Sequence, residues 1–284
     1  MKHTKTIALG VACGVLAFAD SLQAQHYPAG SEGLKAATLP PPGFYFRDYN
    51  QFYFANDFEG GPPGFDVTAY VNAPRLIWIT DLKILGASYG MDALIPLGYV
   101  DISSDPGGPN KSRFSFGDVC LEPATLSWHT KQFDVALAYA VWAPTGDDDL
   151  AGLGAGFWSH MLTAGATWYV DQDKTWSVSA LNRYEINHER KNFTVGDTWT
   201  LEWGIGKAVS KTVEVGVVGY YQAQVTDDDP KGGGGKPHVA AIGPEVSAFF
   251  PKLGMFASLR YLCEFAANND TEGHLFTLTL TKPL

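Results

Sequence analysis

Apolar and polar residues alternate along most of the chain from Phe44 to the C-terminus. In residues 213–225, one set of alternate positions is mostly valine, tyrosine and alanine, whereas the other set carries glutamate and glutamine. Residues 133–143 repeat this pattern, with large apolar side chains on one face and small or polar ones on the other. A period of two is typical of β-strands, because successive side chains point to opposite faces. The pattern therefore predicts an all-β protein.

The alternation divides the chain into twelve predicted strands. Apolar stretches are separated by clusters of glycine, proline and polar residues, which favour turns. The predicted strands cover approximately residues 44–54, 65–79, 83–99, 113–128, 132–144, 157–170, 175–189, 197–208, 213–226, 237–250, 255–267 and 273–281.

The connections between these strands alternate between short and long. The tight connections are 81–83, 129–131, 171–174, 210–212 and 251–254, and the others are longer and polar. A soluble β-sandwich has no need for this alternation. A transmembrane barrel has short periplasmic turns, longer outer loops and an even number of strands, and it closes because lipid cannot hydrogen-bond a bare sheet edge. The sequence thus predicts a single antiparallel transmembrane β-barrel of about 12 strands over residues 44–284.

Aromatic spacing gives separate support for the barrel. Trp158 and Trp168 share one face of a predicted strand. A tilted strand climbs about 25 Å over that distance, which is the height of the apolar band of an outer-membrane barrel. Residues 273–281 form a suitable closing strand, although the chain ends in Lys282-Pro283-Leu284 where such barrels usually end in an aromatic residue. A soluble sandwich or lipocalin-like protein is the alternative.

The N-terminus has the features of a secretory signal peptide. Lys2 and Lys5 precede the apolar run 7–19, and Ala24 is a small residue at a suitable cleavage position. The run is too short for a membrane-spanning helix. A buried N-terminal helix is the alternative, and a lipoprotein is disfavoured because Cys13 lies inside the apolar run. Residues 1–24 therefore predict export to the outer membrane of a Gram-negative bacterium.

Residues 25–43 are too rich in glycine and proline to form a strand of the wall. Prolines cannot donate ladder hydrogen bonds and favour an extended polyproline form, and the few apolar anchors cannot make a core of their own. We predict a short plug or collar at the periplasmic mouth, with a flexible periplasmic tail as the alternative. The plug residues would be Tyr27, Leu34, Leu39, Pro40, Pro41 and Pro42.

If the apolar face of each strand contacts lipid, the other face lines the lumen. The charges on it either form a network that supports the barrel or line an acidic, selective path for solutes. Arg183 with Glu185 and Arg260 with Glu264 are candidate pairs within their own strands. The candidate lumen-lining residues are Asp118, Glu122, Asp134, Arg183, Glu185, Glu202, Glu214, Tyr220, Glu245, Arg260 and Glu264.

Catalytic and cofactor motifs are absent from the sequence. It contains no nucleophile elbow, phosphate-binding loop or zinc motif, so we expect no enzyme activity and no cofactor. Ser127 and His129 share a face, but they have no evident acid partner. The aspartate runs 147–149 and 227–229 favour loop solubility over a metal site.

Charge and cysteine content narrow the partners further. The net charge of −10 argues against nucleic acid, which requires a basic surface. Cys120 and Cys263 lie in segments that face opposite ways, so no disulfide is predicted. The expected partners are outer-membrane lipid and small solutes.

Several stretches resemble the outer-membrane barrel family of the meta-pathway of phenol degradation. They are HYPAGSEGLKAATLPPPGFY, GDVCLEPATLSWH, WAPTGD, WSHMLTAGATWYVDQDKTWSVSALNRYEINHER and GYYQAQVTDD. The resemblance covers nearly all of the chain after the leader and implies a barrel for uptake of small hydrophobic or aromatic compounds. A non-transporting structural barrel or a lipid-acting outer-membrane enzyme is the alternative function.

Overall fold

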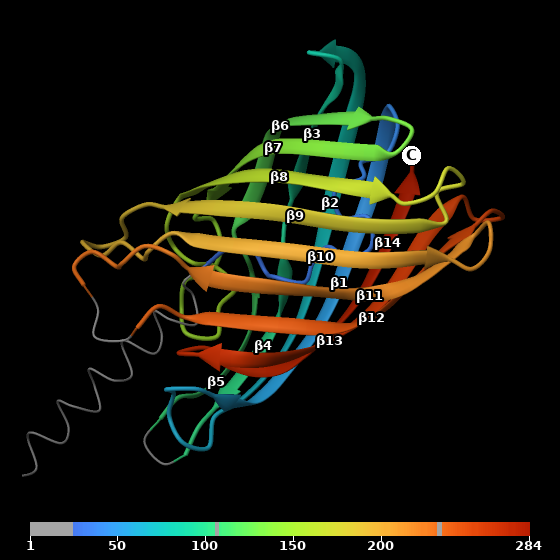
Figure 1. The fold of residues 1–284 in the computed structure, drawn as a ribbon. Coiled ribbons are helices and arrows are strands. Elements are labelled where there is room, and N and C mark those ends of the chain that lie inside the picture. Colours follow the sequence, from blue (N-terminus) through green and yellow to red (C-terminus); the bar gives the residue numbers. More distant parts are fainter. Residues whose placement is uncertain (1–24, 106–107, 232–234) are drawn as a thin grey trace, which may run out of the picture.

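The computed structural model describes residues 25–105, 108–231 and 235–284, so the predicted signal peptide lies outside the described residues. The described chain is all-β (Figure 1), and none of it forms a helix of the length and hydropathy needed to cross a membrane. The strands are β1 (Gly43–Phe58), β2 (Asp66–Ile84), β3 (Ala87–Leu94), β4 (Leu97–Ser103), β5 (Asn110–Phe116), β6 (Val119–His129), β7 (Phe133–Ala143), β8 (Ser159–Tyr169), β9 (Trp176–Asn187), β10 (Thr198–Ala208), β11 (Val213–Gln224), β12 (His238–Phe250), β13 (Met255–Asn268) and β14 (Thr271–Pro283).

Twelve strands close into an antiparallel barrel, and β4 and β5 add two further strands. β1 closes the wall because it pairs with both β2 and β14, so that Tyr45 lies opposite Ile77 on one side and Pro283 on the other. Closure leaves no bare edge along the ladder between β1 and β14, as a lipid environment requires. The predicted barrel is confirmed.

The predicted third and fourth strands are each divided in two. Ile95 and Pro96 separate β3 from β4, and Gly117 and Asp118 separate β5 from β6. Proline has no N–H to donate to the ladder, and the Pro96 carbonyl instead accepts the Gly117 N–H at 2.9 Å. The two breaks therefore face each other, and beyond them β4 pairs with β5 while β3 pairs with β6.

One predicted turn is in the wrong place. Residues 81–83 belong to β2, which continues to Ile84, and the reversal occurs at Leu85 and Gly86. Both residues have positive φ values, 52° and 83°, as a two-residue hairpin of the primed type requires. We call this end of the barrel the short-turn end and the opposite end the long-loop end; in Figure 1 the short turn after β8 lies on the right.

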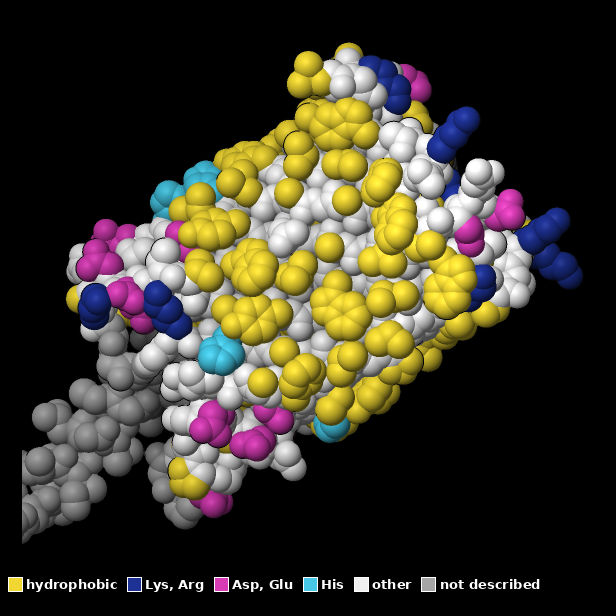
Figure 2. All heavy atoms as spheres, in the orientation of Figure 1, with side chains coloured by type: hydrophobic (Ala, Val, Ile, Leu, Met, Phe, Trp, Pro, Cys, Tyr) yellow, Lys and Arg dark blue, Asp and Glu magenta, His cyan; other side chains and the backbone are white. Residues whose placement is uncertain are grey.

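The outer face of the wall is apolar. Trp158 and Trp168 are 53% and 43% exposed on it, and Figure 2 shows the apolar side chains as a wide band around the visible face. We call this surface the apolar band. Exposure of many large apolar side chains suits a lipid environment rather than water.

Candidate functional site

The N-terminal segment, residues 25–42, runs inside the barrel along its length. At the long-loop end, the Gln25 amide donates to Gln222 at 2.7 Å. Near the short-turn end, the Thr38 hydroxyl donates to Asp134 at 3.0 Å. The expected location at the periplasmic mouth is therefore corrected: polar partners spaced along the inner wall hold the segment over the whole height of the lumen.

His26 is clamped between two carboxylates. Its Nδ1 lies 2.7 Å from Glu185 and its Nε2 lies 3.2 Å from Asp118. The ring also stacks on Trp142, with ring centroids 5.5 Å apart. Burial alone would lower the pKa of His26, but its hydrogen bonds to Asp118 and Glu185 raise the pKa to about 9. The imidazolium form is thus favoured, and it ties the segment to the wall.

A second anchor lies one residue further along the segment. The Tyr27 hydroxyl donates to Glu202 at 2.7 Å, and the Arg183 guanidinium lies over the Tyr27 ring, 4.0 Å from its centroid. Arg183 also forms an ion pair with Glu202. Glu202 accepts the backbone N–H of Glu32 at 2.9 Å as well, so one buried carboxylate holds two points of the segment.

A third anchor requires a glycine. The Glu245 carboxylate accepts the Leu34 N–H at 3.1 Å, and Arg260 donates to the Ser31 carbonyl at 3.1 Å. Any side chain at Gly33 would collide with the Glu245 carboxylate and the Arg260 guanidinium. The absence of a side chain there lets the backbone approach the wall closely.

Toward the short-turn end, the segment fills the lumen with both polar and apolar contacts. Lys35 pairs with Glu214 at 2.6 Å. Leu39 packs against a buried cluster of Tyr45, Ile77 and Ile79. The lumen is therefore occupied at this level.

The predicted lumen residues have their side chains inside the barrel, Glu214 half-buried and the others buried. The predicted pairs within single strands are wrong: Arg183 pairs with Glu202 and Arg260 with Glu245, in both cases across neighbouring strands. Glu245 lies directly opposite Arg260 on the adjacent strand, whereas Glu202 lies diagonally across from Arg183, whose direct partner is Thr200. Long side chains at both opposite and diagonal positions of adjacent strands can reach each other.

Some of the predicted residues, among them Glu264, Tyr220 and Glu122, bond to the wall itself. Glu264 accepts hydrogen bonds from the hydroxyls of Tyr53 and Tyr220 and from the Gly273 N–H. Glu122 accepts from Thr125 at 2.7 Å.

A further charged network was missed at the sequence level. Glu32 pairs with Arg47 at 3.2 Å and with Arg75 at 3.6 Å, and it accepts the Tyr49 hydroxyl at 2.6 Å. Arg75 also forms a bidentate pair with Asp92. The same alternation that selects the other lumen residues places both arginines on inner faces, and that signal was available in the sequence.

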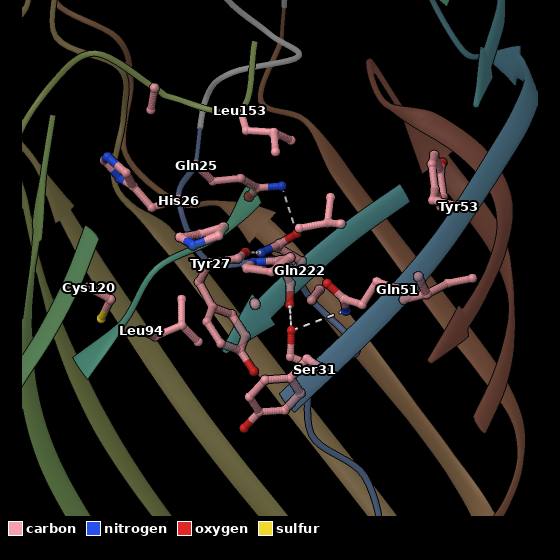
Figure 3. Close-up of a pocket in the computed structure, with 18 of the residues that line it drawn as sticks. Gln25, His26, Tyr27, Ser31, Gln51, Tyr53, Leu94, Cys120, Leu153 and Gln222 are labelled. Carbon is pink, nitrogen blue, oxygen red and sulfur yellow. Dashed lines mark hydrogen bonds between the residues drawn. The ribbon is translucent and has the colours of Figure 1, made fainter. Parts of the chain in front are cut away.

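A cavity of about 370 Å³ lies beside residues 25–32 of the segment, and inward residues of β1, β2, β3 and β6 line it on one side and inward residues of β11 to β14 on the other. In Figure 3, Leu94 and Cys120 lie on one side of Tyr27 and Ser31 of the segment, and Tyr53 lies on the other. Small apolar side chains of β2 form one part of the cavity wall, whereas Tyr49, Arg75, Asp92 and Glu122 make another part of it polar. The β2 residues are Val67, Ala69, Val71 and Ala73.

The loop between β7 and β8 covers the cavity from the long-loop end. Asp118, which contacts His26, accepts the backbone N–H groups of Gly146 and Ala155, both at 2.7 Å. Leu153 of this loop lines the cavity. The loop and the segment therefore share one buried carboxylate, which links their positions.

Residues 48–280 match the family described as "Putative MetA-pathway of phenol degradation". The chain belongs to this family. An outer membrane channel from Pseudomonas putida F1 is similar in structure, with a TM-score of 0.77 and 15% identity over 92% of this chain and 100% of that one. The β domain of the Bordetella autotransporter Brka has a TM-score of 0.55 and 11% identity over 86% of this chain and 100% of that one. No curated protein matches the chain.

Ser127 and His129, the two residues considered for catalysis, do not hydrogen-bond to each other. Contrary to the expectation from the sequence, His129 does have an acid partner, since its Nδ1 lies 3.0 Å from Asp134. The buried Ser127 hydroxyl has no hydrogen-bond partner among the described residues.

The aspartate runs and the cysteines have structural surroundings. Asp148 pairs with Arg190 and Asp227 with Lys231, and no cluster of the described residues has the composition of a metal site. Cys120 and Cys263 are free thiols. The loop acids thus form ion pairs within the loops.

Proposed function

We propose that the protein is an outer-membrane channel for uptake of small hydrophobic or aromatic compounds, with its long loops outside the cell and its short turns in the periplasm. The cavity beside the N-terminal segment is the observation that carries this proposal. The orientation follows from loop length, because outer-membrane barrels place their short turns in the periplasm.

The size and lining of the cavity suit a molecule of one or two rings. An apolar cavity of roughly 150 Å³ is large enough for benzene, and this one measures about 370 Å³. Val67, Ala69 and Val71 offer an apolar surface. Gln51 and Tyr53 line the same space and can hydrogen-bond a single hydroxyl group. A phenolic compound combines these two features.

Passage toward the periplasm requires the segment to shift. Beyond the cavity, the Glu32 network and the Leu39 cluster occupy the lumen. A segment held by several separate ion pairs can detach at one of them while the others remain. If it never detaches, the protein is a non-transporting barrel, which is the second candidate function that this dense anchoring favours.

The proposal is tested by filling the cavity. Ala69→Trp places a bulky side chain in the cavity, and uptake of radiolabelled phenol by cells carrying this variant should fall to the background of cells without the protein. Leu76→Trp is the matched control, because Leu76 lies on the same strand and is 59% exposed on the outer face.

Both variants are first checked for folding by their heat-dependent shift in gel mobility. Normal phenol uptake by folded Ala69→Trp would refute the cavity as the route. Equal uptake by cells with and without the native protein would favour the non-transporting barrel.

A further inference from the structure

Histidines on the outer face of the barrel gather in three aromatic clusters near the long-loop end. Each cluster spans neighbouring strands, and together they extend over β7 to β14 and reach β1. Figure 2 shows histidine side chains at the edge of the apolar band on the side of the long loops. The first rim cluster contains Tyr139, His160 and His188, the second Trp199, Tyr221 and His238, and the third Phe54, Tyr261 and His274.

The rim clusters lie at one edge of the apolar band. His160 is the second residue of β8, next to the exposed Trp158 and far along the strand from Trp168. His238 is the first residue of β12, and His274 is the fourth of β14. Strand starts on β8, β12 and β14 all lie at the long-loop end, so the histidines share one level.

The opposite edge of the band is different. There, Phe44 stacks on Trp78 with ring centroids 5.1 Å apart. The described histidine at that end, His129, is bound to the buried carboxylate of Asp134. Outward histidines are thus a feature of the long-loop edge, and a general preference of aromatic rings for membrane interfaces does not account for this asymmetry.

In two of the histidines, one ring nitrogen contacts a tyrosine hydroxyl and the other does not. The Tyr139 hydroxyl lies 2.7 Å from Nδ1 of His160, and the Tyr261 hydroxyl lies 2.8 Å from Nδ1 of His274. When the phenol donates to Nδ1, the imidazole carries its proton on Nε2. Both rings also lie nearly parallel to their tyrosines, at 18° and 14°. In that tautomer, each tyrosine orients a ring whose Nε2–H is free to donate.

These donors are not used by acids of the chain. Among the described residues, the histidine ion pairs involve His26 and His129. His188 adds a further imidazole beside His160, with ring centroids 4.9 Å apart. Neighbouring imidazoles at a membrane interface suit an anionic oxygen ligand, because a hydrogen bond from Nε2–H to an anionic oxygen is stronger than one to a neutral oxygen.

We propose that the rim clusters bind the phosphate groups of phosphorylated glycolipid headgroups in the outer leaflet. This rests on the orientation given under Proposed function, with the long loops outside. Phosphates at several points around the rim would fix the depth and tilt of the barrel in the bilayer.

The test uses the purified full-length chain in detergent, with bis-phosphorylated lipid A as the ligand and the temperature of half-unfolding as the readout. Lipid A should raise this temperature for the native protein, whereas fully dephosphorylated lipid A and inorganic phosphate should not. In the triple variant His160→Phe, His188→Phe and His274→Phe, lipid A binding should be roughly tenfold weaker, as expected for loss of hydrogen bonds to a charged group.

Trp158→Phe is the control for the rim aromatics and should bind lipid A as the native protein does. His160→Gln, tested singly, covers the case that the triple variant does not fold, and should weaken binding to a smaller degree. Equal stabilisation by phosphorylated and dephosphorylated lipid A, or an unchanged response in the histidine variants, would overturn the proposal. This experiment does not measure phenol uptake, so a failure of the lipid-binding proposal can be told apart from a failure of the channel proposal.

Discussion

The two sides of the lumen differ in what their inner faces carry. On β9 to β13, the inward residues include Arg183, Glu202, Glu245 and Arg260, and these hold the N-terminal segment. On the long-loop half of β2, the inward residues are small and apolar and face the cavity. Both sides have the same alternation along the strand. Side-chain charge and volume at the inward positions therefore decide which side is filled by the chain itself and which stays open.

The charged inner faces of β9 to β13 also explain why the segment is held in one position in the lumen. A buried carboxylate is costly unless it is paired and hydrogen-bonded. Glu202 satisfies this need with Arg183, Tyr27 and the Glu32 N–H. The wall and the segment thus complete each other's hydrogen bonds. On β2, Arg75 also pairs with Glu32 of the segment, whereas the inward residues of its long-loop half carry no charge that needs a partner.

Among the tests of this difference, deletion of part of the segment should have the largest effect on conductance. Deletion of residues 31–39 removes the anchors at Glu245 and Asp134 and empties the short-turn half of the lumen. Conductance in planar bilayers should rise on the order of tenfold. The reason is that the lumen of a twelve-strand barrel is wider than that of an eight-strand barrel, which side chains fill, and narrower than the open channel of a large porin. Heat-dependent gel mobility checks that the barrel still assembles. A folded deletion variant with native conductance would mean that the segment does not limit passage.

The His26 clamp should make the segment sensitive to alkaline pH. Because the pKa of His26 is raised from its ordinary 6.5 to about 9, its contribution is fully present below about pH 6.5 and is lost as the pH rises through about 9. We expect the open probability to increase several-fold between pH 7 and pH 10. His26→Asn should already be more open at pH 7 and should respond less to pH. A pH response as large as that of the native protein would exclude His26 as its source.

Much of the fold could be predicted because it depends on a local period. Alternation along one strand is enough to place Glu202 and Glu245 on the inner face, whatever their partners are. The same rule applied to Arg47 and Arg75 would have found the Glu32 network. Pro96, inside a predicted strand, was a usable signal for the break between β3 and β4.

Other features depend on contacts that no local pattern contains. The path of residues 25–42 is set by partners more than a hundred residues away, such as Glu185 for His26. The cavity exists because Val67 and Ala69 are not reached by that path. The turn at Leu85 was missed because a leucine with positive φ is uncommon, and sequence signals for such turns favour asparagine or aspartate.

Glu264 offers the smallest but most local test, because it lies where the cavity meets the β13 wall. Its carboxylate accepts the Tyr53 hydroxyl at 2.8 Å, the Gly273 N–H at 2.7 Å and the Tyr220 hydroxyl. Glu264→Ala leaves the Gly273 N–H and the Tyr220 hydroxyl without this acceptor, at a cost of about 1–3 kcal/mol for each one, whereas the Tyr53 hydroxyl keeps Thr271 as a partner at 2.6 Å. The temperature of the gel-mobility shift should fall by several degrees, at about 2–4 °C per kcal/mol for a chain of this size.

Glu264→Gln is the matched variant, since its amide oxygen still accepts, and it should lose less stability than Glu264→Ala. Insertion into membranes should be preserved in both, while flux through the channel changes in Glu264→Ala. Equal losses in the two variants would show that the acceptor role is not what matters. Labelling of Glu264→Cys by a lipid-soluble thiol reagent from the bilayer side would contradict the inward position of this residue, and with it the alternation on which the comparison of the two walls depends.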